Sequence, residues 1–115
     1  MTRQQDRLCA DIKRTLAFVL SQKIHNTKIG FISITQVMLS DDGKFAKVYY
    51  SQIGSGQDKQ VTKKALESLK GVIKGELGRQ MRIKIVPNLQ FIFDPSLEVG
   101  TDVIQTLKDL DEKDA

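Results

Sequence analysis

The stretch from Gln60 to Gln80 constrains the fold more than any other part of the chain. Its apolar residues recur at positions i, i+4, i+8, i+11, i+12 and i+16, which share one face of an α-helix. These residues are Val61, Ala65, Leu69, Val72, Ile73 and Leu77. The spacing predicts a long helical stretch that buries one face against a core and ends at Gly78.

Lysines and glycines occupy the other sides of this helical stretch. At 100° per residue, Lys63, Lys70 and Lys74 lie within about 40° of one another, away from the apolar arc. A third sector carries Gly71, Gly75 and Gly78. Each glycine costs about 1 kcal/mol inside a helix, so three on one side indicate a bend, a close neighbour or a backbone that approaches something bulky. Positive charge beside bare backbone suits a sugar-phosphate chain.

Length and composition predict one globular domain. The chain has 115 residues, of which 40% are hydrophobic, so we expect a single domain over residues 1–110 and a frayed acidic tail over 111–115. No apolar run approaches the ~20 residues that a spanning helix needs, and the N-terminus lacks the apolar segment of a secretion signal. One cysteine forms no internal disulfide and no zinc cluster. We therefore expect a cytoplasmic protein.

Charge is distributed unevenly along the chain. Residues 59–84 hold eight basic and two acidic groups (8 − 2 = +6), whereas residues 94–115 hold two basic and seven acidic groups (2 − 7 = −5). A basic middle followed by an acidic end is typical of a protein that binds a polyanion. A solvated surface that only aids solubility is the alternative interpretation, and the charge count does not separate the two.

The N-terminal segment predicts an amphipathic helix from Thr2, its N-cap, to about Lys23. Its apolar face comprises Leu8, Ile12, Leu16, Val19 and Leu20, with Cys9 as a buried small hydrophobe. A second basic stripe, away from that face, comprises Arg3, Arg7 and Arg14. The single histidine, His25, fits a favourable contact with the helix C-terminus better than catalysis.

Residues 30–53 predict a β-hairpin around the turn at 41–44, with a bulge near Gln36 where the alternation of apolar residues changes phase. Tyr49 and Tyr50 must point to opposite faces of the second strand, one toward the core and one free to stack on a base.

The rest of the chain predicts two more elements after the central helix, which Asp58 caps. Residues 82–94 alternate as a long strand that Pro87 interrupts, with Arg82 and Lys84 on the face opposite the apolar one. Residues 103–110 form a short final helix. The order α-β-β-α-(bend)-α-β-α predicts an α+β fold in which a three-stranded sheet carries its helices on one face.

The sequence lacks the motifs of common catalytic and cofactor sites. It contains no P-loop, GxGxxG, HExxH, GxSxG or CxxC motif, and its one histidine and one cysteine leave no nucleophile–base pair. We therefore expect neither an enzyme nor a protein with a metal or cofactor. Glu76 falls on the apolar side of the helix, so either a bend near Gly71 changes the register there or a buried base pairs with Glu76.

Three blocks of sequence together resemble a known family. They are residues 37–50 (VMLSDDGKFAKVYY), 65–78 (ALESLKGVIKGELG) and 82–94 (RIKIVPNLQFIFD), the last followed by SLEVG at 96–100. The element order is similar to that of a type II KH domain, but helical residues replace its GxxG phosphate-clamping loop. This combination resembles the ribosome-binding factor A family over residues 7–107, in order and in spacing.

The resemblance implies a KH-like domain in which a helix–kink–helix, containing Gly71 and Gly75, replaces the GxxG loop. Leu69 stands where the family typically has Ala at the kink. It also implies a monomer in the free state that binds the precursor small ribosomal subunit through its rRNA. In this family the factor assists late maturation of the subunit, including its terminal rRNA regions, and matters most in the cold.

Our leading hypothesis is therefore non-catalytic rRNA binding during assembly of the small subunit. The expected phosphate contacts are Lys63, Lys70, Lys74, Arg79, Arg82 and Lys84, with Lys64, Arg3, Arg7 and Arg14 of second rank. Two other classes remain open at this point: a general KH-like single-stranded RNA binder or RNA chaperone without a ribosomal target, and a basic dock for an acidic protein.

Overall fold

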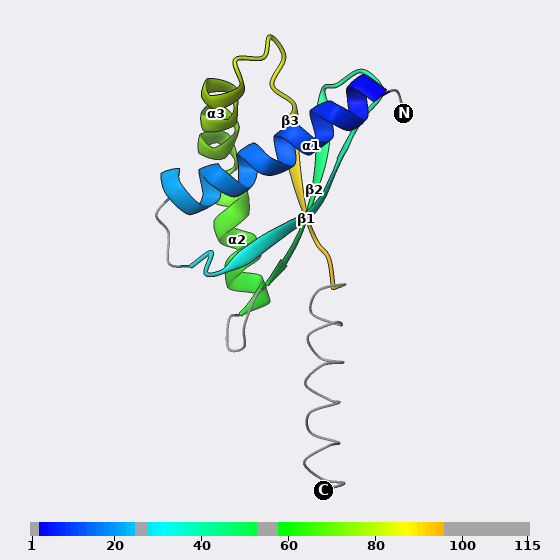
Figure 1. The fold of residues 1–115 in the computed structure, drawn as a ribbon. Helices are drawn as coiled ribbons and strands as arrows, with labels where there is room; N and C mark the ends of the chain where they lie inside the picture. Colours follow the sequence, from blue (N-terminus) through cyan, green and yellow to red (C-terminus); the bar gives the residue numbers. More distant parts are fainter. Residues whose placement is uncertain (1–2, 25–27, 53–57, 96–115) are drawn as a thin grey trace, which may run out of the picture.

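The computed structural model describes residues 3–24, 28–52 and 58–95, and its elements follow the predicted order through the last strand (Figure 1). Helix α1 spans Arg3–Phe18 and runs into a π-helical turn, η1, at Val19–Lys23. The strands are β1 (Ile32–Leu39), β2 (Phe45–Gln52) and β3 (Asn88–Phe93), and the helices before β3 are α2 (Lys59–Ser68) and α3 (Lys70–Met81).

The three strands form a mixed sheet in the order β1-β2-β3, with β1 antiparallel and β3 parallel to β2. Side chains along β2 alternate between buried (Ala46, Val48, Tyr50) and exposed or half-buried (Phe45, Lys47), as expected when one face of a sheet meets a core. The helices cover that face, and the prediction of an α+β fold with helices on one side of a three-stranded sheet is confirmed.

The core joins the apolar residues that the sequence predicted for α1, the sheet and the central helices. From α1 and η1 it takes Ile12, Leu16 and Val19, and from α3 it takes Ile73 and Leu77, all fully buried. Cys9 is buried among them as a free thiol, as predicted for a small hydrophobe.

The hairpin and its bulge agree with the prediction. The β1–β2 register shifts between Ile34 and Gln36, which leaves Thr35 as the extra residue. The Thr35 hydroxyl donates to Asp94 Oδ2 at 2.6 Å, and the Asp94 N–H donates to the Tyr50 carbonyl at 2.7 Å. The bulge therefore ties β1 to the end of β3 across the middle strand.

The turn between β1 and β2 is held by Asp42. Its Oδ1 accepts from the Ser40 hydroxyl at 2.7 Å and from the Lys44 N–H at 3.0 Å, and these bonds lower the pKa of the Asp42 carboxyl. Gly43 adopts a φ of 74°, which glycine reaches without a steric penalty.

Two predictions about the region after α2 are wrong. Gly78 does not end the helix: α3 continues to Met81, and Arg82 caps it with a left-handed φ of 54° while its N–H donates to the Gly78 carbonyl at 2.9 Å. Gly78 instead permits close packing, because a Cβ there would lie 2.8 Å from Val86 Cγ2.

The strand predicted over 82–94 is also shorter than expected, since β3 begins at Asn88. The positive φ of Arg82 turns the chain, and Pro87 has no N–H to donate to a neighbouring strand. The first ladder contact is the Asn88 N–H, which donates to the Lys44 carbonyl at 2.8 Å. Arg82 and Lys84 therefore do not share one face of a strand.

Several predictions fall outside the described residues: the Thr2 cap, the environment of His25, the helix over 103–110 and the frayed tail over 111–115. Within the described ranges, none of the helices has the length and apolar character that crossing a membrane would require.

Two glycine substitutions in α3 should have opposite effects on stability. Gly75→Ala should raise the free energy of unfolding by about 1 kcal/mol, because the new Cβ meets nothing within 4 Å and alanine is the better helix former. Gly78→Ala should lower it by on the order of 1 kcal/mol, since overpacking against Val86 outweighs the same helix gain. Urea unfolding of both full-length variants measures the difference, and equal stabilisation would show that Val86 yields without cost.

Candidate nucleic-acid interface

Helix α2 is fixed at its start and along its buried face. Asp58 Oδ1 accepts from the backbone N–H groups of Gln60 (2.8 Å) and Val61 (3.3 Å), which confirms the predicted N-cap. The fully buried Thr62 accepts from Gln52 Nε2 at 3.1 Å, and its hydroxyl lies 3.4 Å from the Ile29 carbonyl. With that face anchored, Lys63 and Lys64 project outward and are exposed.

The predicted bend is a break at Leu69, two residues before Gly71. Leu69 has φ −98° and ψ 4°, outside the helical range, and separates α2 from α3. Its N–H still donates to Ala65 (3.1 Å), and its carbonyl accepts from Ile73 (2.8 Å), so the break leaves these backbone groups paired. The helix–kink–helix that the resemblance implied is present with Leu69 at the kink.

Two residues of the predicted apolar face are not buried. Val61 and Val72, both assigned to that face by periodicity, are exposed, Val72 by 55%. The prediction is wrong for these two residues, which lie at one edge of the face that meets the core. Leu66 and Ile73 are instead fully buried on either side of the break.

Glu76 forms an ion pair within its own helix. Its carboxylate lies 3.2 Å from the Arg79 guanidinium one turn later, and its side chain is 19% exposed against 77% for Arg79. The partner is thus a surface arginine, and the alternative of a buried base is wrong.

The two lysines of α3 are held in place by neighbours. Lys70 Nζ lies 2.7 Å from Glu67 Oε2, an ion pair that spans the break, and Lys74 Nζ donates to Asn88 Oδ1 at 2.8 Å. The amide partner of Lys74 is neutral, so it orients the ammonium group without cancelling its charge. Both lysines are half-buried and keep part of their surface in solvent.

Glycines lie directly beside these lysines. Gly71 follows Lys70 and Gly75 follows Lys74, and a Cβ at either glycine would meet nothing within 4 Å. The third glycine of the predicted strip, Gly78, packs against Val86 and is not part of an open surface. The bare backbone of α3 is therefore limited to its first half.

The remaining predicted cations occupy three places. Arg79, Arg82 and Lys84 are exposed at the end of α3 and in the segment that follows. Arg7 and Arg14 are exposed on α1, where Arg14 lies 3.6 Å from Asp11. The side chain of Arg3 lies outside the described part of the chain. The predicted cations thus lie on α2, on α3 with residues 82–84, and on α1, which is a separate helix.

The two tyrosines of β2 differ as predicted. Tyr50 is buried and makes edge-on contacts with Phe91 and Phe93, with ring centroids 6.5 and 5.9 Å apart. Burial raises the pKa of the Tyr50 phenol, and the charge of Glu67 adds to the effect. Tyr49 is half-buried on the opposite face, so only Tyr49 retains ring surface that a base could meet.

A cation that the sequence did not single out lies beside Lys64. Lys28 and Lys64 line a hollow of about 410 Å³ together with Val61, Ala65 and Ser68. Thr62 contacts the carbonyl groups of Lys28 and Ile29, and these contacts connect residues 28–29 to α2 beside the hollow. These partners are more than 30 residues apart in sequence, so no periodicity could have indicated the contact.

The described residues do not form a metal-binding cluster at this interface. Across the described ranges, no group of three or more His, Cys, Asp or Glu side chains could hold a metal ion. The arrangement consists of fixed ammonium and guanidinium groups around an open stretch of backbone, which can bind phosphates.

Comparison with known proteins places the chain in a family. The family model described as ribosome-binding factor A matches residues 4–107. The chain is 41% identical over 109 residues to ribosome-binding factor A of Staphylococcus carnosus, with 95% of each chain covered.

Two known structures have a similar fold. The crystal structure of ribosome-binding factor A from Thermus thermophilus superposes with a TM-score of 0.70 at 25% identity, covering 77% of this chain and 93% of that one. A homology model of the Thermus thermophilus factor, fitted into a cryo-electron microscopy map of a 30S complex, has a TM-score of 0.63 at 24% identity over 76% and 91% of the two chains. With the family model matched over nearly its whole length, the chain belongs to the ribosome-binding factor A family.

Proposed function

We propose that this protein is a non-catalytic assembly factor that binds rRNA of the precursor small ribosomal subunit and assists its late maturation, including the terminal rRNA regions. The surface that would bind is the α2–Leu69–α3 unit with residues 82–84. One observation carries the proposal. On α3, Lys70 is followed by Gly71 and Lys74 by Gly75, and the space above both glycines is empty.

Preorganised charge beside bare backbone supports phosphate binding. A sugar-phosphate chain can approach the α3 backbone where no Cβ projects, and the adjacent ammonium groups then lie within reach of its phosphates. Glu67 and Asn88 restrict the two lysines before RNA arrives, so less side-chain freedom is lost on binding. Lys63, Arg82 and Lys84 form no ion pair with another described residue, and their full charge is available to RNA.

Specificity in this proposal comes from the shape of the RNA and of the ribosome. Phosphate contacts position a protein but carry no base information, and Tyr50, the more buried of the two tyrosines, is unavailable for stacking. Membership in the family, together with the 30S complex named for the Thermus thermophilus protein, supports the small subunit as the target. In this proposal the protein is cytoplasmic, acts as a monomer and needs no cofactor.

Sedimentation tests the choice of target. The protein in a cell extract should co-migrate with free small subunits and not with full ribosomes. A general RNA chaperone would instead spread through fractions that hold other RNA. A protein that docks to an acidic partner would remain in its complex after nuclease treatment.

Removing the two lysines of α3 should weaken RNA binding and its dependence on salt. For Lys70→Ala/Lys74→Ala, the slope of log K against log salt with a single-stranded RNA should become shallower by about 1.4, that is 2 × 0.7. The matched control is Lys23→Ala/Lys47→Ala, which removes the same charge from exposed sites on η1 and on β2. Equal slopes for the two variants would contradict the assigned surface.

Side chains added to the bare backbone should weaken binding without harming the fold. Gly71→Ala/Gly75→Ala should lower affinity for small subunits several-fold, because the new methyl groups stand where the phosphate chain approaches. The same variant should unfold at higher urea concentration than the wild type. Unchanged affinity in a stabilised protein would show that RNA does not approach this backbone.

A further inference from the structure

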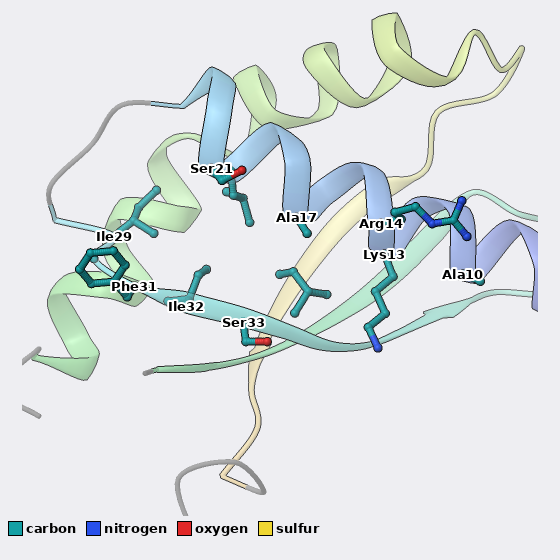
Figure 2. Close-up of a pocket in the computed structure, with 12 residues that line it drawn as sticks. Ala10, Lys13, Arg14, Ala17, Ser21, Ile29, Phe31, Ile32 and Ser33 are labelled. Atoms are coloured by element: carbon teal, nitrogen blue, oxygen red, sulfur yellow. The ribbon is translucent and has the colours of Figure 1, made fainter. Parts of the chain in front are cut away.

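A groove runs between α1 and β1, on the side of the domain where the sheet has an edge strand (Figure 2). It has a volume of about 650 Å³, and apolar side chains such as Leu20, Ile29 and Ile32 line it. Phe31 lies at one end and is 81% exposed, which is unusual for so large an apolar side chain. The groove therefore leaves an apolar surface uncovered within the described part of the chain.

Two cations lie toward the other end of the groove. Lys13 and Arg14 project from α1, and Figure 2 shows Lys13 pointing toward β1. Arg14 contacts Asp11 at 3.6 Å but remains 79% exposed, so its charge is largely unscreened by protein. An occupant of this groove needs apolar side chains for most of its length and negative charge at one end.

The last described residues lie at the sheet end next to this groove. Thr35 of β1 donates to Asp94 at 2.6 Å, and Tyr50 pairs with both Ile34 and Phe93 in the ladder. Residues 96–115 therefore start near the first residues of β1, two of which (Ser33 and Ile34) line the groove. To reach the groove, the rest of the chain has to pass only the end of the middle strand, β2.

The sequence that follows has the two required properties. Residues 96–115 carry two basic and six acidic groups (2 − 6 = −4). Their apolar residues Val103, Ile104, Leu107 and Leu110 recur at i, i+1, i+4 and i+7, the spacing of one helix face. Residues 96–102 can span up to about 23 Å when extended, more than the roughly 10 Å that separates β3 from β1.

We propose that the C-terminal segment docks in the α1–β1 groove of its own chain. Val103, Ile104 and Leu107 would cover the apolar floor, and the acids of residues 109–114 would lie near Lys13 and Arg14. RNA fits the groove less well, because its floor offers no partner for phosphates. A second copy docked groove to groove would bring the same two cations of each chain together, which like charges disfavour.

The docked segment would place negative charge beside Arg14, one of the α1 cations considered above for RNA. The cations of α2 and α3 would stay open. The docking itself does not depend on the proposed function, since it rests on the groove and the segment alone.

A spin label on the full chain tests the docking. In a Cys9→Ala background, a nitroxide at Gln105→Cys should broaden the ¹⁵N-amide signals of Ala17, Ser33 and Ile34 to less than half their intensity in the reduced sample. The amides of Asn88 and Leu89, on the opposite edge strand and at the other end of the sheet, should keep their intensity. Weak and uniform broadening, or broadening centred on that end of β3, would overturn the proposal.

Two controls make the result specific. Ala17→Asp places a charge in the groove at an exposed helix position and should abolish the broadening, whereas Gln80→Asp, also exposed but on α3, should leave it unchanged. Broadening that survives Ala17→Asp would overturn the proposal. So would broadening that appears when ¹⁵N-labelled chains without the nitroxide are mixed with unlabelled chains that carry it, because the occupant would then be a second copy.

Discussion

The break at Leu69 divides the central helical stretch into α2 and α3 without exposing its apolar face. Leu66 and Ile73 are both fully buried, one on each side of the break. Leu69 itself has φ −98° and ψ 4°, yet its N–H and carbonyl keep their helical partners in Ala65 and Ile73. The Glu67–Lys70 ion pair spans the junction between the two helices.

This break also determines how the lysines are divided between the two helices. It leaves Lys63 on α2 and gives Lys70 and Lys74 a separate helix, on which Glu67 and Asn88 restrict them. Gly71 and Gly75 then lie beside these lysines with open space above the backbone. In the proposed function, this open stretch of backbone is where a phosphate chain would approach the two lysines.

A second constraint acts at the other side of the sheet, where the bulge at Thr35 meets Asp94. β1 and β3 do not pair with each other, so this side-chain hydrogen bond joins the two outer strands directly. It also places the end of β3 near the groove between α1 and β1. A single extra residue in β1 thereby influences where the acidic C-terminal sequence begins.

Much of the fold follows from local patterns that can be recognised in the sequence. Alternation and the 41–44 turn predicted the hairpin, helical spacing predicted the buried faces of α1 and α3, and Asp58 predicted the start of α2. The neighbourhood of Lys70 with Gly71 and Lys74 with Gly75 was also predictable, because residues adjacent in a helix remain adjacent in the fold.

What the sequence alone determined is thus the order of elements and the residues that share a helix turn or a strand face, since these depend on spacings of a few residues. Only the tertiary structure decided that Gly78 packs against Val86, that Lys74 bonds Asn88, and that Lys28 lies beside Lys64. Each of these contacts joins separate elements, and their geometry depends on the break at Leu69, on the turn at Arg82 or on the docking of Thr62. Local spacing carries no information about such contacts, because packing of the whole core sets the distance between elements.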